Sequence, residues 1–419
     1  MSTMLSMDEA LVRVRACCTP LPAERIALSA AGGRVLATAV DAPRDLPPFA
    51  NSAMDGFALR WRDGLAAGTT LPVLAEQAAG DGIAGQSDGA CSIMTGARIP
   101  DGLDTVVPVE DCTAVGRDSE GRPASIVLSL APRSGQHVRH AGEDVAAGQR
   151  VLEAGVRLDE EALLVLRGIG IGQVEVRRRP RLALACTGRE LVDADGAALA
   201  PGQIANTNGP YLQRLFAEAG AEVVERVTLP DEPAAFAAWL ARWLDAGIEI
   251  IATTGAVSMG RYDFVPEVLA AAGAELHFHK LKMRPGKPLL FASAGRGTLV
   301  FGLPGNPVSC TVGARFFVDA ALRALAGRAP EAPLRLPLAH GARKKPGFRM
   351  VQKAALALDA DGRLQVRLLP GQESFKTAPL LDARAWALLP EEADNLPAGT
   401  PVPVYPLRPD GAPFDGLIR

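Results

Sequence analysis

The sequence predicts a multidomain protein built around a central α/β domain whose sheet is mostly parallel. Three observations lead to this fold class. The chain has 419 residues, which is too long for one ordinary domain. Residues 179–328 alternate short apolar runs of β period with amphipathic helical runs. Finally, three loops rich in Gly or Pro lie at or near the ends of apolar runs, at Thr253–Asp263, Met283–Pro288 and Gly302–Ser309.

Each element of the central domain has its own pattern. The first strand is expected at Arg181–Cys186 and is followed by the turn Thr187–Gly188. The segments 211–219 and 234–246 repeat apolar residues at i, i+3, i+4 and i+7, which is typical of a helix with one buried face. Further strands are expected at 222–229, 248–253, 276–281, 289–292 and 297–301, and further helices at 265–272 and about 308–326.

The remaining sequence divides into segments of different character. Short β-like runs separated by turns indicate a small inserted β-rich domain, and the segments on either side of it would then form one discontinuous linker and dimer domain with short helices at 7–18 and 159–166. The clearest boundary is Val176–Arg181, and the Pro-, Leu- and Val-rich end of the chain indicates an all-β domain. The predicted domains are residues 1–50 with 135–178, residues 51–134, residues 179–328 and residues 329–419.

Composition excludes several classes of protein. The net charge is −3 and the basic residues are scattered, so nucleic-acid binding is not expected. Six cysteines lack CxxC spacing and predict reduced, mostly buried thiols rather than a zinc site. No apolar run approaches 18 residues and the N-terminus has no apolar signal region, so we expect a cytoplasmic protein that does not bind membranes.

The three loops predict a crevice for a phosphate-like or oxyanion ligand. Loops at the carboxyl ends of parallel strands converge, and glycine lets backbone N–H groups approach an anion closely. Asn306 is expected near the N-terminus of a long apolar helix, where the helix dipole favours an anion. Neither a GxxxxGK[ST] loop nor a GxGxxG after a strand is present. Side chains that would add charge or hydroxyl groups are Arg284, Lys287, Ser258 and Ser309, with Asp263 available for a cation.

Two motifs in the β-rich region each allow two interpretations. Asp55-Gly56 could form the turn of a type I′ hairpin, or it could hold a carboxylate on a rigid loop for a metal or a ribose. Thr95-Gly96 could simply end a strand, or the N–H groups of Thr95–Ala97 could form a nest that faces a phosphate.

Two acidic motifs have the same ambiguity. Glu143 and Asp144 fit a solvated turn, but their carboxylates could also join a Mg²⁺ site. Thr187-Gly188 follows the first strand of the α/β domain, which favours a role in ligand binding, and Glu190 would point into the same crevice.

Taken together, the motifs resemble those of the molybdopterin molybdenumtransferases, which include the bacterial MoeA proteins and the E domain of gephyrin. Seven occur in the family's order and cover nearly the whole chain: PPFANSAMDGFA, IMTGARIPDGLDTVVPVE, GEDVAAG, TGREL, TTGAVSMGRYD, KLKMRPGKP and GLPGNPVS. The resemblance implies a four-domain homodimer with a composite active site, whose third domain resembles the molybdopterin adenylyltransferases.

The resemblance also implies a reaction and its participants. Adenylylated molybdopterin and molybdate would be the substrates, Mg²⁺ the cofactor, and AMP and molybdenum cofactor the products. Partners would include a molybdopterin adenylyltransferase and apoproteins of molybdoenzymes.

Residues are assigned to roles by their positions in these motifs. The implied catalytic residues are Asp55 (from the second subunit), Thr95, Glu190 and Asp263. Metal binding is implied for Asp144, Asp263 and Glu190. Substrate binding is implied for Thr187, Gly188, Asp231, Gly255, Ser258, Lys280, Arg284, Lys287, Pro304, Gly305, Asn306, Ser309 and Ser374.

Three positions depart from the family pattern. Arg189 stands where the family has an acidic residue, and Phe348 stands where it has an arginine, although Arg349 follows directly. Glu373 replaces a glycine and would repel a dianion beside it. These last two changes favour an alternative function, a cofactor-binding or handover protein of the same fold. A general nucleotide hydrolase is a third alternative, disfavoured because the N-terminal motifs are all present.

Overall fold

The computed structural model describes residues 4–82, 89–119, 121–193, 196, 198–257 and 264–410. The chain folds into two compact units. One is Arg25–Val176, and the other combines Met1–Glu24 with Arg177–Arg419. Within the described ranges no helix has both the length and the apolar character needed to span a membrane.

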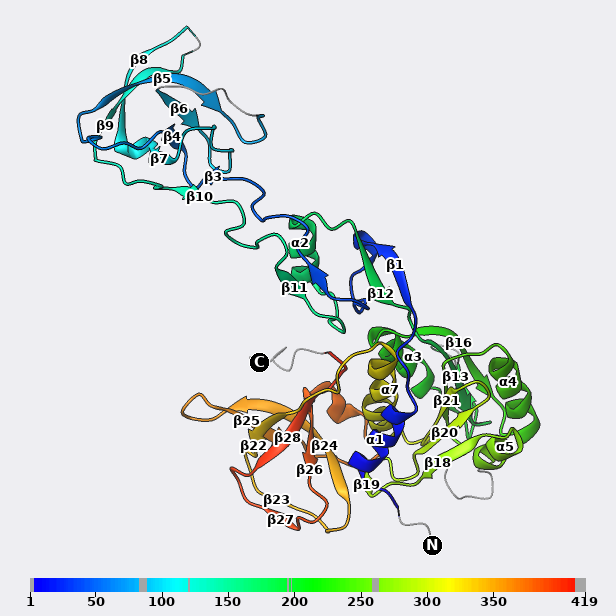
Figure 1. Cartoon of the computed structure of the whole chain (residues 1–419). Helices are drawn as coiled ribbons and strands as arrows, with labels where there is room; N and C mark the ends of the chain where they lie inside the picture. The colour runs from blue at the N-terminus through cyan, green and yellow to red at the C-terminus, as the bar shows by residue number, and fades with distance from the viewer. Residues whose placement is uncertain are drawn as a thin grey trace. The chain divides into compact units, whose positions relative to one another are not determined.

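The unit Arg25–Val176 contains a six-stranded sheet and a smaller helical part (Figure 1). Buried aliphatic residues such as Leu36, Leu158 and Leu166 form the core of the helical part around helix α2 (Glu160–Gly168). The sheet has the order β7-β4-β6-β5-β9-β8 and consists of Thr105–Pro108, Gly56–Leu59, Ala90–Ile93, Thr70–Gln77, Pro123–Leu128 and Cys112–Arg117. The other elements are α2 (Glu160–Gly168) and the strand pairs β1–β12 (Ala23–Ala27, Gln173–Arg177), β2–β11 (Val40–Asp41, Arg150–Leu152) and β3–β10 (Asn51–Ser52, Val138–Arg139).

A six-stranded sheet forms the centre of the other unit, with the order β16-β13-β17-β21-β20-β18. The first four strands pair in parallel, and β20 is antiparallel to both of its neighbours, β21 and β18. Five of the six strands therefore run in one direction, which confirms the predicted mostly parallel sheet. The strands are β13 (Arg181–Thr187), β16 (Glu222–Leu229), β17 (Ile250–Thr254), β18 (Glu275–His279), β20 (Leu290–Ala294) and β21 (Thr298–Leu303).

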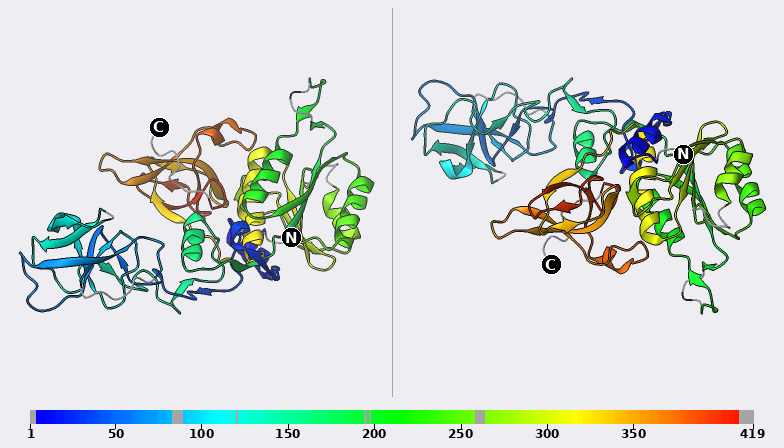
Figure 2. Two further views of the ribbon diagram at one scale, coloured as in Figure 1. Left: turned by 90° about the horizontal axis from the view of Figure 1, so that it is seen from above. Right: turned by 90° about the horizontal axis from the view of Figure 1, so that it is seen from below.

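Helices cover both faces of this sheet, as Figure 2 shows. Strand β13 is buried on both sides because Leu182 and Leu184 face one apolar cluster while Ala183 and Ala185 face the other. The first cluster includes residues of α1 (Met7–Ala16), α3 (Asn208–Glu218), α6 (Pro307–Gly313) and α7 (Asp319–Leu325). The second includes residues of α4 (Pro233–Asp245) and α5 (Val265–Ala271).

The N-terminal helix corrects one of the predicted domain assignments. The sequence grouped residues 1–50 with 135–178, but α1 packs on α7 and its Met7, Ala10 and Val14 enter the core of the α/β unit. Ser6 begins this helix with a capping box, because its hydroxyl accepts the Glu9 N–H while the Glu9 carboxylate accepts the Ser6 N–H.

The C-terminal residues form a β domain that continues from the α/β domain. Its sheet has the order β19-β24-β26-β28-β22, and β25 pairs with β24. Strand β19 (Met283–Arg284) belongs to the second of the three predicted loops, so this sheet includes a piece of the α/β domain. The other strands are β22 (Leu334–Pro337), β24 (Arg349–Leu358), β25 (Leu364–Leu368), β26 (Ala385–Leu389) and β28 (Pro401–Pro406), with a separate pair β23–β27 (Ala342–Arg343, Asn395–Leu396).

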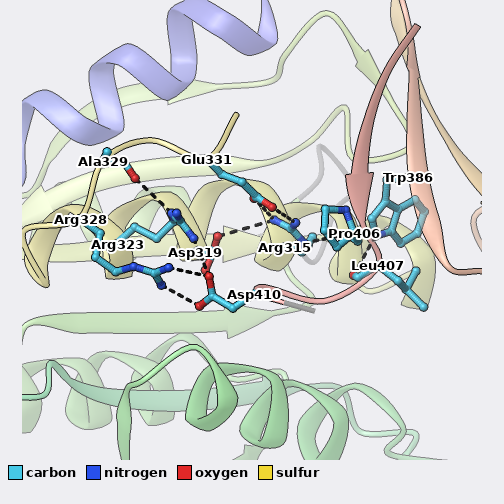
Figure 3. A network of polar contacts seen from close by, with 10 residues as sticks. All are labelled: Arg315, Asp319, Arg323, Arg328, Ala329, Glu331, Trp386, Pro406, Leu407 and Asp410. Atoms are coloured by element: carbon cyan, nitrogen blue, oxygen red, sulfur yellow. Dashed lines mark hydrogen bonds and ion pairs between the residues drawn. The ribbon is translucent and has the colours of Figure 1, made fainter. Parts of the chain in front are cut away.

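Buried charges join the last helix to the C-terminal domain (Figure 3). The predicted helix 308–326 is interrupted by a π-helical turn at Ala314–Val318, and within it Arg315 is only 1% exposed. The Arg315 guanidinium donates to both carboxylate oxygens of Glu331, at 2.9 and 2.8 Å, and to the Pro406 carbonyl at 3.2 Å. Asp319 lies 3.6 Å from Arg315, and burial raises the pKa of its carboxyl to about 6.

Asp319→Asn should therefore change how stability depends on pH. The folded chain holds the Asp319 proton more tightly than the unfolded chain, so the wild type loses stability as the pH rises from about 4 to about 6. The variant lacks this loss, and its unfolding free energy relative to wild type should rise across that window by about 2–3 kcal/mol. Chemical unfolding at a series of pH values measures the difference. Asp382→Asn at an exposed site is the control, and a difference that does not vary with pH would contradict the prediction.

Candidate active site

A polar crevice of about 850 Å³ opens where strands β13, β17 and β21 end. Because these strands are parallel, their carboxyl ends meet at one side of the sheet, as expected for ligand sites in α/β proteins. The residues that line the crevice are Thr187–Leu191, Ile204–Asn208, Pro230–Glu232, Thr254–Ala256, Gly305–Pro307 and Phe375. The crevice thus contains Glu190 and six of the predicted substrate-binding residues: Thr187, Gly188, Asp231, Gly255, Gly305 and Asn306.

Close backbone packing shapes the floor of the crevice. The Thr187 hydroxyl donates to the Thr254 carbonyl at 3.1 Å, which joins the ends of two neighbouring strands. Gly255 has φ +86°, and a Cβ atom at this position would lie 2.5 Å from the Thr187 carbonyl oxygen. Only glycine fits there without moving the backbone that forms the crevice.

Three carboxylates line the crevice, from Glu190, Asp231 and Glu232. Asp231 is held in place because its Oδ2 accepts the backbone N–H of Arg189 at 3.1 Å. The departure at Arg189 therefore leaves this contact intact, since the contact uses only the backbone. Within the described ranges, no three His, Cys, Asp or Glu side chains gather closely enough to hold a metal ion.

Two asparagines that the sequence analysis missed also form the crevice wall. Asn206 is buried and donates to Asp193 and Thr228, at 3.1 and 3.0 Å, while its Oδ1 accepts the Gly209 N–H at 2.9 Å. Asn208 donates to the Gly305 carbonyl at 2.8 Å. The available signal was the pair of asparagines at the start of helix α3, where Asn206 precedes the helix and Asn208 is its first residue, because asparagine is common at helix starts.

A second cavity of about 370 Å³ adjoins the crevice and is cationic. Asn306 lines both cavities, so the two meet there. The second cavity is hereafter called the oxyanion pocket. Its lining is Arg284–Pro288, Pro304, Asn306, Ser309, Met350, Gln352, Gln372 and Ser374. The pocket thus contains the predicted substrate-binding residues Arg284, Lys287, Pro304, Ser309 and Ser374.

The C-terminal domain supplies one wall of the oxyanion pocket through the loop 372–376. The Ser374 carbonyl accepts the N–H of Val308 at 3.0 Å, which fixes this loop against helix α6. Lys353 is fully buried beneath the loop, and its Nζ donates to the Lys376 carbonyl at 2.9 Å. Burial lowers the pKa of the Lys353 ammonium. Gln372 donates to the carbonyls of Lys353 and Leu369, at 2.8 and 2.7 Å.

Two positions beside this pocket, Phe348 and Glu373, depart from the family pattern, and the structure shows the contacts around each. Arg349 does not take the place of the missing arginine, because its guanidinium pairs with Asp8 at 2.6 and 2.8 Å and with Glu391 at 3.0 Å. Glu373 forms an ion pair with Lys376 at 2.8 Å, and the hydrogen bond from Lys376 lowers the pKa of its carboxyl. Its charge is thus offset by a cation, which weakens the expected repulsion of a dianion.

Asp55 and Thr95 lie together in the unit Arg25–Val176. The Asp55 Oδ1 accepts the Thr95 N–H at 2.7 Å. The hairpin interpretation of Asp55-Gly56 was wrong, because β3 pairs with β10 whereas β4 pairs with β6 and β7. The phosphate-nest interpretation of Thr95–Ala97 was also wrong. All three N–H groups have partners within the protein, namely Asp55, the Ser52 carbonyl and the Met94 carbonyl.

The remaining predicted residues are distributed differently from expectation. Asp144 is exposed and belongs to the unit Arg25–Val176, whereas Glu190 belongs to the other unit. Lys280 has φ +77° and lines neither the crevice nor the oxyanion pocket. Ser258 and Asp263 lie outside the described residues.

These features define an α/β protein with a crevice at the carboxyl ends of its parallel strands and a second, cationic cavity beside it. Comparison with known proteins agrees. Residues 5–170 match the MoeA N-terminal region (domains I and II), residues 183–324 match a probable molybdopterin binding domain, and residues 335–407 match the MoeA C-terminal region (domain IV).

Two relatives and one solved structure match nearly the whole chain. A molybdopterin molybdenumtransferase of Synechococcus elongatus is 40% identical over 396 residues, which are 93% of this chain and 95% of the relative. One of Haemophilus influenzae is 32% identical, with 97% and 99% covered. The crystal structure of the molybdopterin biosynthesis MoeA protein from Pyrococcus horikoshii OT3 is 26% identical, with a TM-score of 0.77 and with 96% and 99% covered. The chain therefore belongs to the MoeA family of molybdopterin molybdenumtransferases.

Gly255→Ala should destabilise the protein more than alanine substitution at another glycine of positive φ. The new methyl group meets the Thr187 carbonyl, and we expect a loss of roughly 2–4 kcal/mol in unfolding free energy. Gly273→Ala is the matched control, because Gly273 has φ +73° but no atom lies within 4 Å of the place that a methyl group would occupy. That variant should lose only about 1 kcal/mol. Equal losses in chemical unfolding would show that the contact with Thr187 does not constrain the crevice.

Proposed function

We propose that this protein transfers molybdenum from molybdate to adenylylated molybdopterin and releases AMP and molybdenum cofactor. The observation that carries this proposal is the meeting of two different cavities at Asn306. The larger one has the size and the polar lining for a nucleotide joined to a pterin. The smaller one has the size and charge for a tetrahedral oxyanion. The names of the relatives, molybdopterin molybdenumtransferases, describe a transfer of molybdenum that involves molybdopterin.

Charge complementarity supports the assignment of molybdate to the oxyanion pocket. Arg284 and Lys287 contribute two positive charges, which match a dianion, and Ser309 and Ser374 contribute hydroxyl groups. A guanidinium forms strong charge-assisted hydrogen bonds to oxyanions. In the reaction that we propose, the two dithiolene sulfurs bond to molybdenum, and one molybdate oxygen leaves as water with the two thiol protons. A water molecule attacks the phosphate anhydride, so AMP leaves and the pterin keeps a phosphate monoester.

Mg²⁺ fits the donor groups of the crevice. This ion is usually bound by one or two carboxylates together with substrate phosphates, rather than by a complete protein cage. Glu190 and Asp231, which both line the crevice, would hold it. When bound, Mg²⁺ would neutralise the charge on the anhydride. Asp144 and Asp263 remain predicted metal-associated residues from the family resemblance.

The proposed active form is a homodimer in which Asp55 and Thr95 of one subunit complete the site of the other. Asp55 is exposed, and the Thr95 N–H holds its carboxylate in one orientation, so it is available to a ligand held by another chain. The proposal also includes substrate binding by Ser258 and Lys280. Its partners are those implied by the resemblance, a molybdopterin adenylyltransferase and apoproteins of molybdoenzymes, and its location is the cytoplasm.

Lys287→Gln should raise the molybdate concentration needed for AMP release. Loss of one charge-assisted hydrogen bond to the dianion should raise the half-saturating concentration about 10- to 100-fold. Asp231→Asn should instead reduce the maximal rate to near zero, because it alters the crevice and not the oxyanion pocket. AMP is measured by chromatography over a molybdate series. Wild-type AMP release that does not depend on molybdate would contradict the proposed transfer.

Mixing two inactive variants tests the composite site. Asp55→Ala and Asp231→Asn would each inactivate both sites of their own homodimer. After subunit exchange, mixed dimers hold one intact site, so an equimolar mixture should recover about a quarter of wild-type AMP release. If the mixture stays inactive although exchange is demonstrated with labelled subunits, Asp55 does not act in the site of the neighbouring subunit.

The presence of Phe348 favours one alternative function, a cofactor-binding or handover protein. Without the family arginine, the oxyanion pocket has fewer cations to bind molybdate. Such a protein would bind adenylylated molybdopterin without molybdate-stimulated cleavage. The same AMP assay, combined with a measurement of pterin binding, distinguishes the two functions.

A further inference from the structure

The Phe348 ring lies against both cations of the oxyanion pocket. The Arg284 guanidinium carbon is 4.5 Å from the ring centroid, and the Lys287 ammonium nitrogen is 5.7 Å from it. Both distances fall within the roughly 6 Å range of cation–π attraction. Phe348 itself does not line the pocket, so it contacts these cations from outside.

Within the described ranges, carboxylates do not compete with the ring for these cations. Among the residues that the structure describes, neither Arg284 nor Lys287 forms an ion pair. The two nearby acidic residues of the C-terminal domain are already paired, Glu373 with Lys376 and Glu391 with Arg349. Arg284 and Lys287 both contact the Phe348 ring, and within the described ranges no carboxylate neutralises either of them.

Such a contact orders a cation without neutralising it. Long Arg and Lys side chains lose considerable rotamer freedom when they are fixed, and this loss opposes ligand binding unless the side chains are ordered beforehand. A carboxylate would order them too, but it would cancel the charge that an oxyanion needs. An aromatic face attracts a cation through its quadrupole and has no net charge.

We propose that Phe348 is a positioning residue that pre-orders Arg284 and Lys287 for a tetrahedral oxyanion, and so compensates in part for the missing arginine. The identity of that oxyanion as molybdate rests on the proposed function. The proposed ordering of the two cations requires the quadrupole of an aromatic ring, whereas packing alone would require only an apolar side chain of similar size.

The test is direct binding of molybdate alone, measured by titration calorimetry on the full-length protein without a pterin substrate. Phe348→Leu keeps an apolar side chain but removes the quadrupole, and it should weaken molybdate binding about three- to tenfold. Phe348→Trp keeps an aromatic face and should bind as tightly as wild type or more tightly. Thermal unfolding confirms that each variant is folded.

The salt dependence separates positioning from charge. Phe348→Leu removes no charge, so the slope of affinity against ionic strength should match wild type, whereas Lys287→Gln should flatten it. Equal affinities for wild type and the Leu variant, equal weakening in the Leu and Trp variants, or no molybdate binding by wild type would each overturn the inference. AMP release is measured separately. A Leu variant with weakened molybdate binding would therefore support the inference even if the proposed transfer failed.

Discussion

The short parallel pairing of β19 with β24 is the constraint on which the site depends. It matches Met283 with Arg349 and Arg284 with Met350, and the Arg349 N–H donates to the Lys282 carbonyl at 2.9 Å. Strand β19 comes from the α/β domain and β24 from the C-terminal domain, so this pairing fixes the position of one domain's backbone against the other's. The oxyanion pocket exists because this pairing holds its two walls together.

The same register decides which side chain of the C-terminal domain contacts the cations of the pocket. Phe348 precedes β24 and contacts Arg284, whereas the next residue, Arg349, pairs with Asp8 and Glu391. A shift of one residue along a strand moves a side chain to the opposite face. The family arginine and the neighbouring Arg349 are therefore not interchangeable, although they are adjacent in the sequence.

Local patterns in the sequence predicted much of this molecule. Helical periodicity and β-period runs predicted nearly all elements of the α/β domain, and the Gly- and Pro-rich loops predicted a ligand crevice. Such local patterns could not predict which strands, distant in sequence, pair with one another. Asp55-Gly56 has the local chemistry of a hairpin turn, but β4 pairs with β6 and β7, strands distant in sequence. The partners of Arg349 and Glu373 also depend on tertiary packing.

The buried Lys353 has a consequence for how the oxyanion pocket admits a ligand. Its ammonium group is held by the carbonyls of the loop that carries Ser374. Lifting that loop away would leave a cation inside the protein without partners, at a high energetic cost. This wall is therefore anchored to the C-terminal domain instead of being hinged, so the width of the pocket is set by the fold.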